Sequence, residues 1–151
     1  MRKLIAWLCL ALAAAVLPDQ LMAGFIPPDL PPNTPFQLLF VTAGTRDGTS
    51  ANIADYNSFV TAQAALEPTL PITTWHAVLS TAAVNANVNA PSGSLPVYTV
   101  QGETIVLVGG LYGGPLIHGP PDVDQHGALL NTVVWTGSDA TGTGISGLTL
   151  G

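Results

Sequence analysis

Asp122, Asp124 and His126 alternate along the chain and are of the residue types that bind metal ions. On an extended strand, alternate side chains point the same way, so two carboxylates and an imidazole would converge on one calcium or zinc ion. The same residues also fit a solvated hairpin, because prolines and glycines are frequent in this part of the sequence. The surroundings favour the hairpin, and no cofactor is expected.

Trp135 is a second candidate, because an aromatic ring can stack on a sugar. It stands in the run Asn131 to Thr136, whose apolar and β-branched residues predict a strand. A tryptophan in such a strand also fits a position in the hydrophobic core. The strand context favours the core position.

A hydrolase would need one of the three histidines, His76, His118 or His126, as a base. His76 fits a core or edge position in an apolar run, and His118 fits a loop. The sequence contains no G-x-S-x-G nucleophile motif, phosphate loop or dinucleotide fingerprint. No carboxylate pair has a spacing typical of a glycosidase. The protein is therefore predicted not to be an enzyme, and no catalytic residue is assigned.

Residues 1–23 have the pattern of a secretory signal peptide. Two basic residues open the chain, an apolar run follows from Leu4 to Leu17, and Ala23 precedes the predicted cleavage point. The run is shorter than the about 20 residues that cross a bilayer, which argues against a membrane anchor. Cys9 lies inside this run in a bulky context, which does not fit a lipid-attachment site. The sequence predicts a secreted, extracellular or cell-surface protein without a transmembrane segment in the mature chain.

Charge narrows the classes of partner. The 151 residues carry a formal net charge of −6, and removal of residues 1–23 leaves Arg46 as the one basic residue against eight acidic ones. Such a chain cannot neutralise phosphates, which argues against nucleic acid or anionic membranes as partners. The mature chain also lacks cysteine, so its stability has to come from one hydrophobic core or from a ligand.

Three elements are predicted to position these residues. Phe36 to Thr42 reads as a covered strand, and Asn52 to about Leu66 as a helix that buries Ile53, Tyr56 and Val60. Asn52 and Asp55 resemble a capping box, and a proline after the helix stops it. Thr74 to Ser80 alternates as a strand, with one face expected against the helix.

The rest of the chain is predicted to be rich in strands and loops. A proline-rich, extended spacer covers residues 24–35. A small, Asn-rich loop from Ala82 to Gly93 precedes a hairpin of Val97–Val100 and Glu103–Val108, turning at Gly102. Asp122 to Leu130 predicts a second, short hairpin. Together these elements give an α+β domain, residues 36–151, with mostly antiparallel strands.

The order of these motifs resembles a known family. An FVT strand, a helix with Ala54-Asp55, a Trp75-x-Ala77-x-Leu79-Ser80 strand, a hairpin after Pro96 and Val134-Trp-Thr-Gly-Ser-Asp139 follow one another. The order is similar to the endostatin-type branch of the C-type-lectin-like fold, and closest to secreted bacterial proteins that often carry a PEP-CTERM sorting tail. The resemblance covers about residues 36–144.

The resemblance implies further expectations. Ser138 and Asp139, next to Trp135, fall where C-type lectins build a calcium and sugar site, although the ligand motifs of the sugar-binding members are absent from this sequence. The family continues through a long loop to a closing strand, so the chain is expected to be truncated. Without that strand, residues 36–42 would have an unpaired edge, which favours oligomerisation.

The expected function is therefore that of an exported, non-catalytic surface or matrix module, associated with exopolysaccharide or adhesion. The alternative is a soluble, lectin-like module that binds a sugar or another small ligand. In both, the partners are polysaccharides or surface proteins.

Overall fold

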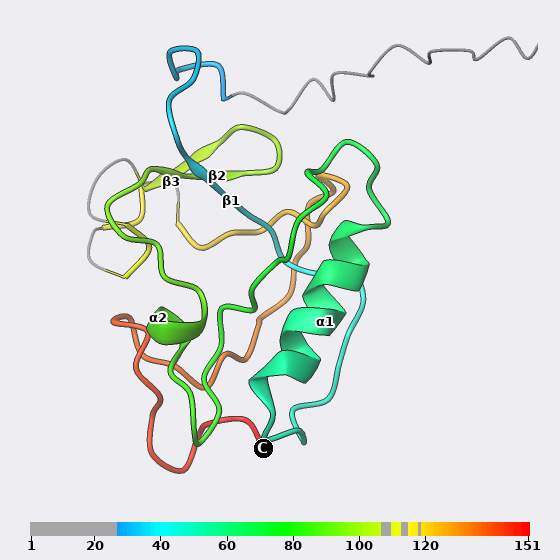
Figure 1. Ribbon diagram of the computed structural model, residues 1–151, viewed down its shortest axis with the longest axis vertical. Helices are drawn as coiled ribbons and strands as arrows, with labels where there is room; N and C mark the ends of the chain where they lie inside the picture. The colour runs from blue at the N-terminus through cyan, green and yellow to red at the C-terminus, as the bar shows by residue number, and fades with distance from the viewer. Residues whose placement is uncertain (1–26, 107–109, 113–114, 118) are drawn as a thin grey trace, which may run out of the picture.

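The computed structural model describes residues 27–106, 110–112, 115–117 and 119–151 (Figure 1). The predicted signal peptide lies outside these ranges. The described elements, in chain order, are β1 (Gln37–Leu39), α1 (Ile53–Ala64), α2 (Ala86–Asn89), β2 (Val97–Thr99) and β3 (Thr104–Val106). This mixed α/β arrangement is compatible with the predicted α+β class. Within the described ranges, no helix is long and apolar enough to cross a membrane.

The three strands form one sheet in the order β1-β2-β3. β1 runs parallel to β2, and β2 runs antiparallel to β3. The sheet is therefore mixed, and the prediction of mostly antiparallel pairing is wrong, because the chain crosses over through α1 and residues 74–80 before β2 pairs with β1. The predicted hairpin is confirmed as β2 and β3, with Gly102 at a φ of 89° in the turn, and residues 107–108 of its predicted second strand lie outside the described residues.

The core lies on this sheet. Val97, Ile105 and Val106 form a buried cluster, with Leu39 and Leu111 packed against it. Tyr98 is fully buried and meets the ring of Phe36 edge to face, with the centroids 6.0 Å apart. β1 is only partly buried, whereas all three residues of β2 are buried. β1 is one of the two edge strands of the sheet, because the strand order is β1-β2-β3.

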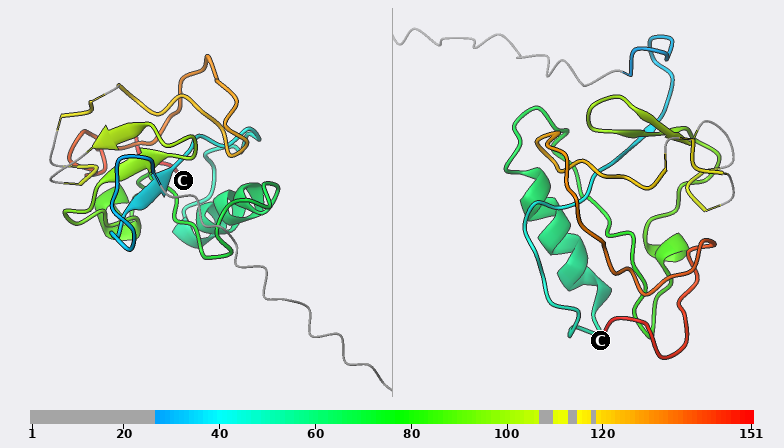
Figure 2. Two further views of the ribbon diagram at one scale, coloured as in Figure 1. Left: turned by 90° about the horizontal axis from the view of Figure 1, so that it is seen from above. Right: turned by 180° about the vertical axis from the view of Figure 1, so that it is seen from behind.

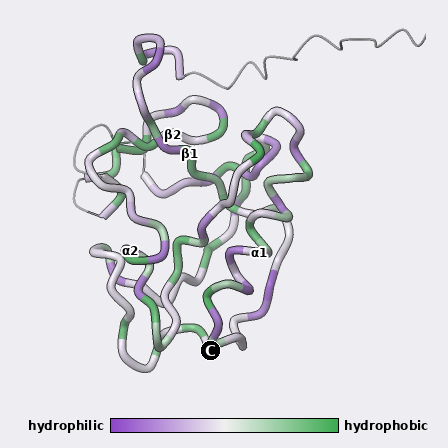
Figure 3. Tube along the Cα trace, in the orientation of Figure 1, coloured by the Kyte–Doolittle hydropathy of each residue, from purple (hydrophilic) through white to green (hydrophobic). Residues whose placement is uncertain are grey.

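The predicted helix is confirmed as α1. The Asn52 side chain caps its first turn by accepting a hydrogen bond from the Ala54 amide at 3.1 Å. Ser50 links the two residues of the predicted capping box. Its hydroxyl donates to the Asp55 carboxylate at 2.7 Å and accepts from the Asn52 amide at 3.1 Å. Tyr56 is buried, whereas Ile53 and Val60 are partly exposed. Apolar and polar residues alternate along α1 (Figure 3).

Residues 74–80 and 131–136 are extended but form no strand ladder, so both predicted strands are wrong in this respect. The two segments run beside each other (Figures 1 and 2), and they meet where the Ser80 amide donates to the Thr136 carbonyl at 2.8 Å. Elsewhere, side chains of α1 take the place of a neighbouring strand for residues 74–80. Strand assignment requires a ladder, which the sequence pattern alone cannot provide.

Two smaller predictions also differ from the structure. The predicted loop from Ala82 to Gly93 contains the four-residue helix α2. Residues 27–35 of the predicted extended spacer form two turns, in which Leu30 donates to Pro27 at 3.1 Å and Thr34 donates to Pro31 at 3.2 Å. Proline fixes φ at a value that suits turns as well as extended spacers.

Candidate functional site

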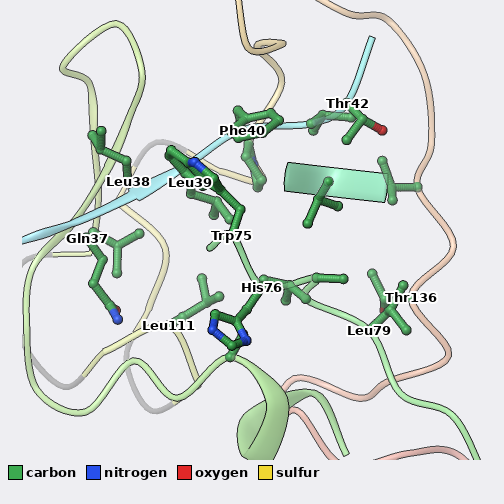
Figure 4. Close-up of a pocket in the computed structure, with 18 of the residues that line it drawn as sticks. Gln37, Leu38, Leu39, Phe40, Thr42, Trp75, His76, Leu79, Leu111 and Thr136 are labelled. Carbon is green, nitrogen blue, oxygen red and sulfur yellow. The ribbon is translucent and has the colours of Figure 1, made fainter. Parts of the chain in front are cut away.

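The described residues form an open trough of about 1830 Å³. Its walls are residues 36–42, which include β1, the extended residues 74–79 and the extended residues 132–136. Figure 4 shows Phe40 and Thr42 on one side of it, His76 and Leu79 on the other, and Thr136 beyond Leu79. Pockets for small ligands usually measure about 300–1,000 Å³. The trough is larger than a small ligand needs.

Helix α1 positions the middle wall. The Thr61 hydroxyl accepts from the Trp75 amide at 3.0 Å and lies 3.2 Å from the Trp75 carbonyl, to which it donates. Asn57 accepts from the Ala77 amide at 2.8 Å. Asn57 and Thr61 are four residues apart and therefore share one face of the helix, while Trp75 and Ala77 share one edge of the extended segment. Two helix side chains thus replace a neighbouring strand.

Asn89 of α2 completes this polar contact. Asn57 and Asn89 exchange two amide hydrogen bonds, both of 2.8 Å, and Asn89 also donates to the Ala77 carbonyl at 2.8 Å. Both backbone groups of the buried Ala77 are therefore satisfied by asparagine side chains. Sequence reasoning missed Asn57 and Asn89, and the signal that could have revealed them is the spacing of Asn57 and Thr61 on one helix face.

The first wall exposes one edge of β1. Gln37 donates to the Pro96 carbonyl at 2.9 Å, and Val41 donates to the Val123 carbonyl at 2.9 Å. Backbone groups alternate in direction along a strand, so the amides of Leu38 and Phe40 lie on the opposite edge. In the described structure, neither amide donates a hydrogen bond to another segment.

The third wall is the most exposed apolar segment of the site. Val133 is 95% exposed, Val134 57% and Trp135 62%. The prediction that Trp135 lies in the core is therefore wrong, because its ring is mostly exposed. The Trp75 ring instead packs edge to face on Phe40, with the centroids 5.0 Å apart. The Trp135 indole N–H donates to the Leu148 carbonyl at 3.1 Å, which fixes the ring while its faces stay accessible.

The side chains of Ser138 and Asp139 make hydrogen bonds within turns of the chain. The hydroxyl oxygens of Ser138 and Ser80 lie 2.8 Å apart, and Ser80 also accepts from the Ala86 amide. The Asp139 carboxylate accepts from the amides of Thr141 and Thr143 and from the Thr141 hydroxyl. The hydroxyl of Thr141 and then the amide of Thr143 hold the pKa of Asp139 below its ordinary value. Trp135 and Asp139 line the trough, whereas Ser138 holds the loop in place.

The structure does not bring Asp122, Asp124 and His126 to one point. The predicted hairpin is present, with a bridge between Val123 and Leu129, so these residues do not form one long strand. Asp124 is buried, and its Oδ1 accepts from the amides of His126 and Ala128. Within the described ranges, no three His, Cys, Asp or Glu side chains converge as a metal site would require. In the described structure, these three side chains therefore do not form the calcium or zinc site that was the alternative to the hairpin.

His126 instead contacts the segment after α1. Its Nδ1 lies 3.0 Å from a carboxylate oxygen of Glu67. This contact, followed by the hydroxyl and amide of Thr69, lowers the pKa of Glu67 from 4.5 to about 2. The neighbouring Gln125 is fully buried and accepts from the Ala43 amide at 2.9 Å. The loop that carries His126 and Gln125 thus connects the end of α1 to the segment that follows β1.

The two remaining histidines and the Trp75 indole complete the description of the site. His76 is exposed at the edge of the trough, whereas His118 lies outside the described residues. The Nε1 atom of Trp75, in the middle wall, is buried and has no acceptor within the described part of the chain. Burying an unpaired donor costs about 1–3 kcal/mol, so an acceptor that reached this atom would be favoured.

No protein-family model, no curated protein and no solved structure matched this chain in the three comparisons.

Proposed function

We propose that this chain is an exported, non-catalytic surface or matrix module that holds an extended macromolecule in its trough. The observation that carries the proposal is the trough itself, whose volume of about 1830 Å³ exceeds that of a typical small-ligand pocket. Two of its walls, residues 36–42 and 132–136, contain no charged residue. An uncharged, extended partner suits these walls, because no charge has to be desolvated when it binds.

Export and fold form part of the same proposal. The signal-peptide pattern of residues 1–23 supports export, and the ordered motifs between Phe36 and Asp139 support a C-type-lectin-like domain of the endostatin-type branch. The observed mixed α/β architecture is compatible with such a domain. That the module works without a cofactor stays a prediction.

Trp135 favours a second candidate function, namely sugar binding. Its ring is 62% exposed, and its indole N–H is fixed to Leu148, so the ring forms a rigid platform. Asp139 lines the same trough and provides a carboxylate that can accept hydrogen bonds from sugar hydroxyls. In this alternative, a neutral sugar would stack on Trp135 at one end of the trough.

Tryptophan fluorescence tests both functions. After removal of residues 1–23, Trp75 and Trp135 are the two remaining tryptophans, and both line the trough. Titration with neutral soluble polysaccharides, with and without calcium or zinc, is expected to give a saturable change if sugars bind. Because Trp135→Ala also removes a fluorescent reporter, binding by the variants is measured by titration calorimetry. Trp135→Ala should lose the binding, whereas Ile72→Ala, at an exposed site outside the trough walls, should keep it.

Two results would overturn the proposal. One is a chain that neither binds a polysaccharide saturably nor associates with a protein through the trough. The other concerns export: when the full chain is expressed in a bacterial host, mass spectrometry of the secreted protein should find a new N-terminus at Gly24. A secreted protein that still carries residues 1–23 would contradict the proposal.

A further inference from the structure

We infer that the trough is a dimerisation surface, in which residues 131–136 of each copy pair with the free edge of β1 in the other copy. The inference rests on the proposed function and names the partner of the same site as a second copy of this chain. Two copies placed trough to trough across a twofold axis would make this contact twice. Such a dimer is closed, because the same surface is used by both copies.

The free edge of β1 lacks the features that protect edge strands. Natural edges are usually blocked by charged side chains, proline, a bulge or a covering element. Residues 36–42 contain neither a charged residue nor a proline, and β1 pairs with β2 in regular register. The edge lines an open trough, and the amides of Leu38 and Phe40 face away from β2. The edge is thus ready to receive a further strand.

Residues 131–136 provide a suitable strand. They contain no charged residue and include Val133, Val134 and Trp135, whose side chains are mostly exposed. β-branched and aromatic residues are the types that favour strands. Within the described residues, no amide of residues 131–135 donates a hydrogen bond, and the Val133 carbonyl has only a distant contact with the Thr132 hydroxyl, at 3.5 Å. The segment is extended and has unpaired backbone groups.

A second copy fits these observations better than another occupant does. The edge and the strand are both unpaired, and both line the same trough of one molecule, so one twofold operation satisfies both. A polysaccharide has no regular series of amides and carbonyls to pair with a strand edge, and a small ligand would leave most of the trough empty.

Charge opposes the association at long range but not at the contact itself. After removal of residues 1–23, each copy has one basic residue against eight acidic ones, so two copies repel each other at long range. The facing segments, residues 36–42 and 131–136, are uncharged and therefore add no repulsion where the copies touch. Salt screens the long-range repulsion, and dimerisation should therefore strengthen as ionic strength rises.

Sedimentation velocity of the mature chain over a wide range of concentrations tests the inference, with Val133→Lys and Ile72→Lys as a matched pair. Val133 and Ile72 are both at least nine-tenths exposed, and both substitutions add one positive charge. Losing the burial of one valine side chain weakens a dimerisation equilibrium by about tenfold, and the twofold dimer contains two copies of the Val133 contact. Val133→Lys is therefore expected to weaken the dimer by about a hundredfold, and Ile72→Lys to leave it unchanged.

Hydrogen exchange locates the contact. In the dimer, the amides of Leu38 and Phe40 should be protected, and dilution or Val133→Lys should release them. A monomer at every concentration, or equal effects of the two lysine substitutions, would overturn the inference. Exchange of Leu38 and Phe40 that does not depend on concentration would do the same. If the chain is monomeric and yet binds a neutral polysaccharide in the trough, the inference fails while the proposed function stands.

Discussion

Replacing Asn57 by alanine tests how α1 holds the middle wall of the trough. The substitution removes the acceptor of the buried Ala77 amide and both hydrogen bonds to Asn89. An unpaired buried amide costs about 1–3 kcal/mol, and the lost side-chain pair about 1 kcal/mol more. Alanine regains up to about 0.7 kcal/mol as the better helix former. The free energy of unfolding should therefore fall by about 2 kcal/mol.

Urea unfolding followed by circular dichroism measures this loss. With a slope of about 1–3 kcal/mol per molar urea, the midpoint should fall by roughly 1 M. Ser58→Ala is the control, because Ser58 is exposed on the same helix and its loss should change stability by less than about 0.5 kcal/mol. If Asn57→Ala costs no more than Ser58→Ala, the asparagine contact does not hold the wall.

A double substitution separates a shared network from two independent contacts. Asn57 and Asn89 bond each other and both backbone groups of Ala77. Because the residues form one network, the combined loss in Asn57→Ala with Asn89→Ala should be smaller than the sum of the two single losses, by about 0.5–3 kcal/mol. Additive losses would show that the two side chains act separately.

Two further predictions concern two glycines in turns and the contact between Glu67 and His126. Gly137 has a φ of 64°, and an added Cβ would lie 2.9 Å from backbone atoms of both Leu148 and Thr149, whereas Gly147 has a φ of 77° and open space around it. Gly147→Ala should cost only the backbone term of about 1–2 kcal/mol, and Gly137→Ala more, in the same urea assay. Equal losses would contradict the close approach. The lowered pKa of Glu67 means that its contact with His126 adds stability above pH 4.5, which is lost as the pH falls towards about 2. The melting temperature of Glu67→Gln should therefore decrease less than that of the unchanged chain over this interval, by a small amount because the pair lies at the surface; identical acid profiles would contradict this.

The positions of several elements could be predicted from the sequence. The helix follows from a capping asparagine, an apolar stripe and a proline after its end, and it forms as α1 between Ile53 and Ala64. The hairpin of β2 and β3 follows from a glycine that accepts a positive φ between two apolar runs. These features are local, so they can be read from neighbouring residues. β1, within residues 36–42, is one of the two edge strands of the sheet, whereas the closing strand that the resemblance implies stays a prediction.

The candidate site could be predicted only in part. Alternation suggested that Asp122, Asp124 and His126 would converge, but a tight turn assigns Asp124 to backbone amides and His126 to Glu67. An apolar strand pattern placed Trp135 in the core, yet its ring is mostly exposed. A periodic pattern shows which residues share a face, but it does not show what covers that face.

The sequence by itself determined the local elements, the acidic charge and the signal-peptide pattern, because each depends on residue type and short spacing. Only the tertiary structure decided that β1 pairs in parallel with β2, that asparagines of two helices hold Ala77, and that residues 36–42, 74–79 and 132–136 surround an open trough. These features depend on contacts between residues far apart in the chain, whose pairing depends on how the whole chain packs rather than on any one segment.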